Sequence, residues 1–125
     1  MTAMNDDPDI ARSRPRLRLR ILFGDEAMLG PGKAELLARI RETGSIAAAG
    51  RQMSMSYKRA WMLVEELNAF FGEPLVTSAR GGQGGGGARL TETGEEVLRL
   101  YREVEEAAAQ AAGPQIERLR QLLRP

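Results

Sequence analysis

The chain has 125 residues and a net charge of +1, with 42% hydrophobic and 28% charged residues. This is the size and composition of one ordinary globular domain with a core of its own. It contains no cysteine and no histidine, which excludes disulfides and thiol nucleophiles and removes the commonest metal ligand and general base. We therefore predict a protein without enzymatic activity, cofactor or metal site.

The charges are unevenly distributed along the chain. Five arginines and no acid lie between residues 10 and 20, whereas six glutamates and two arginines lie between residues 91 and 106. The basic segment suits an anionic partner, although such runs often serve only to keep a surface solvated. The first ten residues are acidic and polar, and no apolar run is long enough to span a membrane, so we expect no membrane association and a cytoplasmic location.

The N-terminal third is expected to contain a tail, a strand and a helix. Residues 1–13 are predicted to be disordered. Residues 16–23 alternate polar and apolar side chains, which predicts a half-buried strand, with its apolar face formed by Leu17, Leu19, Ile21 and Phe23. A helix is expected over residues 31–42, because Pro31 suits a first helical position and Gly44 a stop.

Residues 45–71 carry the central motif. Ser45 is expected to cap a short helix over residues 46–52, a tight turn follows at residues 53–55, and Ser56 caps a longer helix over residues 57–71. One face of the longer helix is apolar and the other is polar, with Lys58, Arg59 and Met62 opposite Ala60, Val64, Leu67 and Phe71. This is the pattern of a helix-turn-helix whose second helix meets base edges and phosphates. Taken alone, the segment fits an ordinary helical hairpin equally well.

A glycine-rich segment, residues 81–87, lies between two expected short strands, residues 75–78 and 88–91. Glycines let a backbone approach a groove closely, and Arg80 and Arg89 flank the segment. Its glycine spacing formally matches a dinucleotide fingerprint, but that motif requires a helix directly afterwards, where a strand is expected here. We interpret the segment as a wing. The fold predicted is mainly α with a small β-sheet, a winged helix-turn-helix with its N-terminal strand beside the wing hairpin.

A long helix is expected from a capping box at Thr93 and Glu96 to about Ala112, followed by a short C-terminal helix within residues 113–125. The apolar residues of the long helix step by four and three, the spacing of a coiled-coil seam. We expect them to form the interface of a homodimer: Val97, Tyr101, Val104, Ala108 and Ala111. The winged domain with this dimerisation helix is placed at residues 14–112.

Two stretches, residues 44–61 and residues 81–91, resemble the N-terminal DNA-binding domain of the molybdate-responsive ModE regulators and, more distantly, that of LysR-type regulators. The resemblance runs from about Arg16 to Ala112. It implies a dimer that binds a palindromic site in double-stranded DNA, usually near molybdenum-related genes, with residues 57–71 in the major groove. The molybdate-binding domains of that family follow the DNA-binding domain, whereas this chain ends at Pro125, so we expect no tight molybdate binding. Gln83 stands where the family often has lysine.

We therefore predict a sequence-specific transcription regulator. The DNA contacts are expected from the turn, the second helix and the wing, namely Ser54, Ser56, Tyr57, Lys58, Arg59, Met62, Arg80, Gly81, Gly82, Gln83 and Arg89. The alternative is a winged-helix interaction module that pairs with another regulator, an assembly factor or an effector-binding protein without touching DNA. It stays open because residues 51–89 carry five basic and three acidic side chains, a modest +2.

Overall fold

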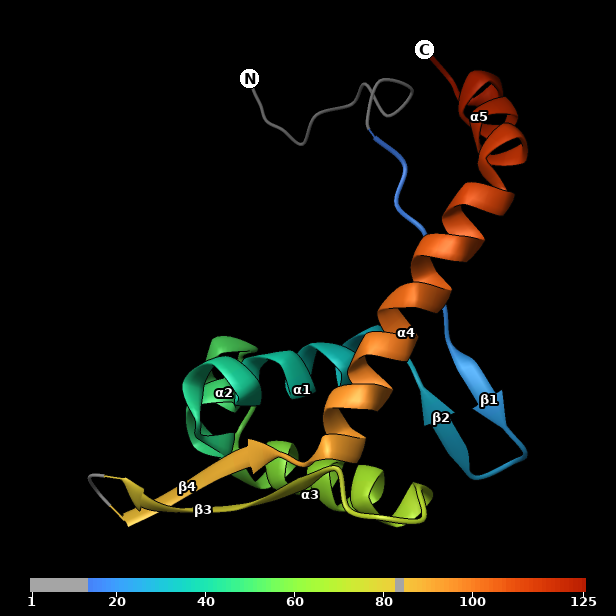
Figure 1. Cartoon of the computed structure of the whole chain (residues 1–125). Helices are drawn as coiled ribbons and strands as arrows, with labels where there is room; N and C mark the ends of the chain where they lie inside the picture. Colours follow the sequence, from blue (N-terminus) through green and yellow to red (C-terminus); the bar gives the residue numbers. More distant parts are fainter. Residues whose placement is uncertain (1–13, 83–84) are drawn as a thin grey trace, which may run out of the picture. The chain divides into compact units, whose positions relative to one another are not determined.

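The computed structural model describes residues 14–82 and 85–125 (Figure 1). Its contacts divide the chain into a larger unit, Leu19–Glu103, and a smaller unit made of the residues up to Arg18 and of Val104–Pro125. The predicted disordered tail, residues 1–13, lies outside the described residues. In chain order the elements are β1 (Ile21–Phe23), β2 (Ala27–Leu29), α1 (Pro31–Thr43), α2 (Ile46–Gln52), α3 (Tyr57–Phe70), β3 (Val76–Gly82), β4 (Gly85–Leu90), α4 (Glu92–Ala111) and α5 (Gly113–Leu122).

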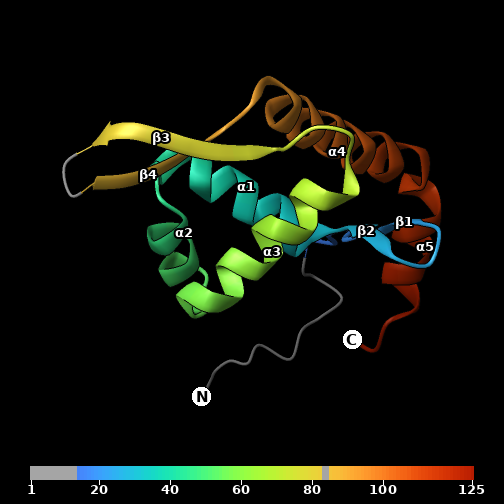
Figure 2. The same ribbon diagram turned by 90° about the horizontal axis from the view of Figure 1, so that it is seen from below.

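Helices α1, α2 and α3 pack together within the larger unit, with the β3–β4 hairpin along one side of them (Figure 2). The predicted caps are confirmed, although α1 ends one residue later and α3 one residue earlier than expected. Gly44 closes α1 in the left-handed conformation, with φ of 72°, a backbone angle that favours glycine. The Oγ atom of Ser45 accepts a hydrogen bond from the backbone N–H of Ala48, and Ser56 Oγ accepts one from Arg59, each at 3.0 Å. Local sequence signals therefore set the boundaries of all three helices.

Helices α2 and α3 cross closely. A Cβ atom on Gly50 would lie 3.0 Å from that of Ala60, so only small residues fit this crossing. The turn between the two helices contains Ser54 with φ of 60°, and the backbone N–H of Met55 donates to the carbonyl of Gly50. A short turn and a tight crossing together give the helix-turn-helix geometry that the small residues of α2 predicted.

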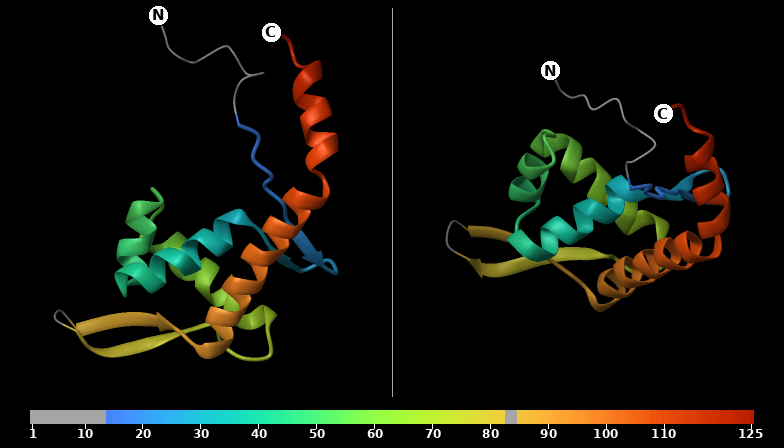
Figure 3. Two further views of the ribbon diagram at one scale, coloured as in Figure 1. Left: turned by 45° about the horizontal axis from the view of Figure 1, so that its top comes forward. Right: turned by 90° about the horizontal axis from the view of Figure 1, so that it is seen from above.

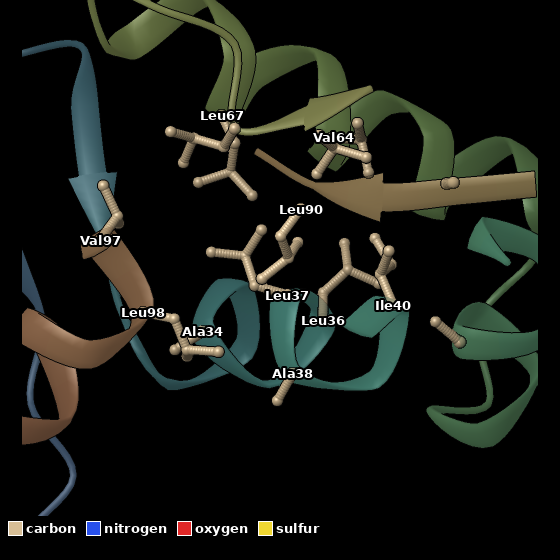
Figure 4. Close-up of a cluster of buried hydrophobic side chains, with 14 of the residues drawn as sticks. Ala34, Leu36, Leu37, Ala38, Ile40, Val64, Leu67, Leu90, Val97 and Leu98 are labelled. Atoms are coloured by element: carbon tan, nitrogen blue, oxygen red, sulfur yellow. The ribbon is translucent and has the colours of Figure 1, made fainter. Parts of the chain in front are cut away.

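The core joins the three helices to the β3–β4 hairpin and to the first half of α4 (Figure 4). Its largest fully buried side chains are Leu36, Leu37, Ile40, Val64, Leu67, Leu75 and Tyr101. The buried Lys33 adds an electrostatic link between α1 and α3, because its Nζ lies 3.5 Å from Glu66 and 5.4 Å from the centre of the Phe70 ring. The predicted inner face of α3 is confirmed for Ala60, Val64 and Leu67, whereas Phe71 is only half-buried.

The wing is a two-stranded antiparallel hairpin that extends from the helices (Figure 3). The pairs Val76↔Leu90 and Ser78↔Ala88 fix its register, and Gly82 pairs with Gly85. Gly81 and Gly82 therefore belong to β3, and Gly85, Gly86 and Gly87 belong to β4, so the expectation that the strands stop at residues 78 and 88 is wrong. The backbone N–H of Ala88 donates to the carbonyl of Gly44 at 2.9 Å, which attaches the base of the wing to the end of α1.

The N-terminal strand differs from the prediction in length and in partner. Only Ile21–Phe23 is a strand, and it pairs with β2 rather than with the wing. Leu17 and Phe23, predicted to face the core, are exposed. An alternating pattern identifies residues that could form a strand but not the strand they pair with. Here the chain turns at Gly24 and returns at once as β2, which the sequence reading missed.

Helix α4 begins earlier than predicted. It starts at Glu92, and Thr91 Oγ1 caps it by accepting a hydrogen bond from the backbone N–H of Gly94 at 2.9 Å. The predicted capping box at Thr93 is wrong, since Thr93 Oγ1 donates instead to the Glu73 carboxylate at 2.6 Å. The predicted break at Gly113 and the short helix after it are confirmed by α5, whose Arg120 side chain donates to Glu117 and lowers the pKa of that carboxyl group.

Candidate nucleic-acid interface

The start of α3 presents a cluster of exposed side chains. Tyr57 and Met62 are 55% and 45% exposed, and Ser54, Ser56, Lys58 and Arg59 are exposed beside them. The opposite side of the helix holds it in the core through Ala60, Val64 and Leu67. Two cationic side chains at a helix N-terminus make this end positive. All six residues predicted from the turn and helix are exposed to solvent at or near the start of α3.

The wing contributes fewer described side chains. Arg89 is exposed and pairs with Thr77, on the face of the hairpin opposite to that of the buried pair Val76 and Leu90. Gly81 and Gly82 continue the backbone of β3. The Arg80 side chain and Gln83, both predicted DNA contacts, lie outside what the structure describes.

Asn68 joins α3 to the wing, a role that the sequence reading missed. Its Oδ1 accepts hydrogen bonds from the backbone N–H groups of Leu75 and Val76 at 2.8 and 3.1 Å, and its Nδ2 donates to the carbonyl of Val76 at 3.2 Å. The side chain thus acts as an extra partner for the start of β3. An amide on the same helical stripe as Tyr57, Trp61 and Val64 was the available signal, because a polar group at such a position needs a hydrogen-bond partner.

A groove of about 790 Å³ lies between the helix-turn-helix and the base of the wing. Tyr57 and Trp61 of α3 line it, together with Ser45 and Ile46 at the start of α2 and Ser78 of β3. Trp61 is not among the DNA-contacting residues predicted from the sequence.

The predicted dimer residues divide into two groups. Val97 and Tyr101 are 8% and 1% exposed, and the Tyr101 hydroxyl donates to the carbonyl of Leu19 at 2.6 Å. The core of the same chain covers both residues, so they are not available at the surface of a single copy. Val104 is 41% exposed, Ala108 is partly exposed and Ala111 is exposed.

Two further properties concern the described residues as a set. No group of three or more carboxylate side chains among them could hold a metal ion. None of their helices combines the length and apolar character that crossing a membrane requires.

Comparison with known proteins identifies relatives of this arrangement. The family model of the bacterial regulatory helix-turn-helix proteins of the lysR family matches residues 32–95. The molybdenum-pterin-binding protein MopB of Rhodobacter capsulatus is 45% identical over 66% of this chain and 31% of its own length. The transcriptional regulator ModE of Yersinia pestis is 44% identical over 64% of this chain and 28% of its own length. The chain thus spans about a third of the length of these relatives.

A solved structure supports the fold. ArgP from Mycobacterium tuberculosis superposes with a TM-score of 0.50 at 21% sequence identity, over 68% of this chain and 30% of that one. The described residues form five helices, a small antiparallel hairpin and a wing, and the predicted winged helix-turn-helix fold is thereby confirmed.

Proposed function

Because this chain belongs to the bacterial regulatory helix-turn-helix family of LysR type, we propose that it regulates transcription by binding double-stranded DNA at specific sequences. The observation that carries the proposal is the extent of the family match. Residues 32–95 include nearly all of α1, the helix-turn-helix and both wing strands, so the match covers the whole candidate interface rather than one short motif.

In this proposal the N-terminal half of α3 enters the major groove. Lys58 and Arg59 suit guanine edges and phosphates, and the hydroxyls of Ser54 and Ser56 suit phosphate oxygens. Met62 offers an apolar contact to base edges. The wing reaches the neighbouring part of the duplex through Arg80, Gly81, Gly82, Gln83 and Arg89. None of these roles requires catalysis, and we infer that the protein has no enzymatic activity and acts in the cytoplasm, where bacterial DNA lies.

The regulated genes are proposed to be related to molybdenum. The support comes from the relatives, two of which carry the names molybdenum-pterin-binding protein and ModE. A third, a molybdenum transport protein ModE of Azotobacter vinelandii, is 38% identical over 77 residues. We therefore propose a regulator of ModE type.

We further propose that two copies bind a palindromic site. Helix α4 supplies the seam through its exposed side, on which Leu100 and Val104 are 45% and 41% exposed, followed by Ala108 and Ala111. Val97 and Tyr101 support the seam from inside by anchoring α4 to the core. A two-fold dimer of this kind places two recognition helices roughly 34 Å apart, which is one turn of DNA, or a multiple of that distance.

The test is selection of bound sequences from a random DNA pool, followed by affinity measurements on the enriched site. We expect a palindrome to be enriched. Lys58→Ala and Arg59→Ala should each weaken binding by about 1–3 kcal/mol if they read bases. Arg118→Ala on α5 removes an exposed arginine far along the chain from α3 and serves as the matched control. Binding should also weaken steeply with salt, since each neutralised phosphate releases counterions. Failure of the wild-type protein to retain any duplex at low salt would contradict the proposal.

The alternative, an interaction module that does not bind DNA, is not favoured by the comparisons. The matched family is described as regulatory helix-turn-helix proteins, and the relatives include transcriptional regulators. The modest +2 charge of residues 51–89 is the one observation that favours a module, and the pool selection tests it directly.

A further inference from the structure

Large aromatic side chains are exposed in the groove between α3 and the wing. Trp61, the one tryptophan of the chain, is 42% exposed, and Tyr57 is 55% exposed. Both line the groove. They are one helical turn apart, at i and i+4, so they lie on the same side of α3. Burying side chains of this size is favourable in free energy, which indicates that this side of the groove contacts a binding partner.

The opposite wall is formed by the base of the wing. Paired residues in an antiparallel hairpin project to the same face, so Ser78 lies on the face that carries Ala88, its buried partner. Ser78 lies on the core-facing side of β3 and lines the groove. Thr77, which shares the outer face with Arg89, lines it too, whereas Arg89 is not among its described lining residues. This wall therefore offers a hydroxyl group rather than a charge.

The chemistry of the groove is neutral and mixed. Its described lining residues include no acidic and no basic side chain. The hydroxyls of Tyr57 and Ser78 make no hydrogen bond with other described residues, and Ile46 and Pro74 add apolar surface to the lining of the groove. Hydroxyl donors suit phosphate oxygens, and an indole face suits the apolar side of a sugar. The absence of carboxylates among these residues permits the approach of an anion.

We propose that this groove binds the sugar–phosphate backbone of one DNA strand, with Trp61 packed against a deoxyribose and the hydroxyls of Tyr57 and Ser78 donating to a phosphate. The inference rests on the proposed DNA binding. The reason is geometric, because major and minor grooves alternate along a duplex and one sugar–phosphate strand separates each major groove from the next minor groove. When a protein places one element in each of two neighbouring grooves, that strand passes between the two elements. With α3 in the major groove and the wing beside it, that strand lies in the groove between them.

The first test uses the intrinsic fluorescence of Trp61. Because this is the one tryptophan in the sequence, emission reports on the groove directly. Titration with the selected duplex should quench the emission or shift it to shorter wavelength, in parallel with binding measured independently by anisotropy of labelled DNA. Saturable binding with no change in Trp61 emission would overturn the inference and leave the proposed function intact. Absence of binding to any duplex would overturn the proposed function itself.

The second test separates backbone contacts from base contacts. Tyr57→Phe and Ser78→Ala remove one hydroxyl each and should weaken binding roughly threefold to tenfold, equally on the selected site and on an unrelated duplex. Because a neutral group releases no counterion, these two variants should keep the wild-type slope of log affinity against log salt concentration. Arg89→Ala should instead reduce the magnitude of that slope by about 0.9, the value for one lost phosphate contact.

The aromatic wall is tested with Trp61→Ala, which should weaken binding more than Trp61→Phe does. Phe23→Ala removes an exposed aromatic side chain from the β1–β2 hairpin and should bind as the wild type does. Circular dichroism melts verify that each variant is folded. Wild-type affinity in both Trp61→Ala and Ser78→Ala, or losses confined to the selected site, would refute backbone binding in this groove.

Discussion

Removal of the Asn68 side chain should loosen the wing from the recognition helix. Asn68→Ala deletes three hydrogen bonds to the backbone of Leu75 and Val76. Both of these residues are buried, at 0% and 5% exposure, so water replaces the lost partners poorly. With about 1 kcal/mol net for each hydrogen bond, and about 0.5 kcal/mol returned by the better helix propensity of alanine, the expected loss is about 2 to 3 kcal/mol.

The assay is thermal unfolding followed by circular dichroism. A loss of this size lowers the Tm by roughly 10 °C or more in a domain of this length. Glu65→Ala, at an exposed position of the same helix, is the matched control for helix propensity and should change the Tm little. The DNA affinity of Asn68→Ala should also be lower than that of the wild type, even at temperatures where the variant is folded, because its wing has lost the attachment to α3. A Tm for Asn68→Ala within about 2 °C of the control would show that these hydrogen bonds do not hold the wing.

Three further outcomes follow from the same structure. Gly94→Ala should destabilise the protein by about 1–3 kcal/mol, because the added Cβ atom would meet the backbone of Leu75. Gly113→Ala, which has open space around it, should leave the stability unchanged. Equal melting temperatures for the two variants would be inconsistent with this packing. Val104→Glu should convert a dimer into monomers by light scattering and weaken DNA binding together, since two like charges would meet near the axis; a variant that stays dimeric would exclude this seam. DNA affinity should change by less than about twofold between pH 6 and pH 8, because the chain lacks histidine and cysteine, the residue types whose charge most often changes in this range; a steep pH profile would point to a perturbed group at the interface.

Several features of the fold could be predicted from the sequence because they depend on residues close together in the chain. The caps at Ser45 and Ser56, the stop at Gly44 and the inner face of α3 are all signals that act within one or two helical turns. The cluster of exposed residues at the start of α3 follows from them. Once Ala60, Val64 and Leu67 face the core, Lys58, Arg59 and Met62 have to face solvent.

Features that depend on distant partners were decided by the tertiary structure. The apolar stripe of α4 has one spacing throughout, but Val97 and Tyr101 are buried in the core whereas Val104 is exposed. Spacing shows that residues share a helix face and cannot show what covers that face. The strand β1 likewise paired with β2, because a hairpin turn at Gly24 competes successfully with a distant sheet edge; nearby strands close with less loss of chain entropy.

Capping and periodicity in the sequence were thus enough to predict the helices of the helix-turn-helix, their capped ends and their outward-facing basic residues. How the helix-turn-helix is joined to the wing became evident only from the tertiary structure. Three features each bring together residues from elements that are separate in the sequence: the hydrogen bonds of Asn68, the contact of Ala88 with Gly44, and the groove between Trp61 and Ser78. Such contacts depend on the packing of whole elements against one another, and the local pattern of residues carries no record of that packing.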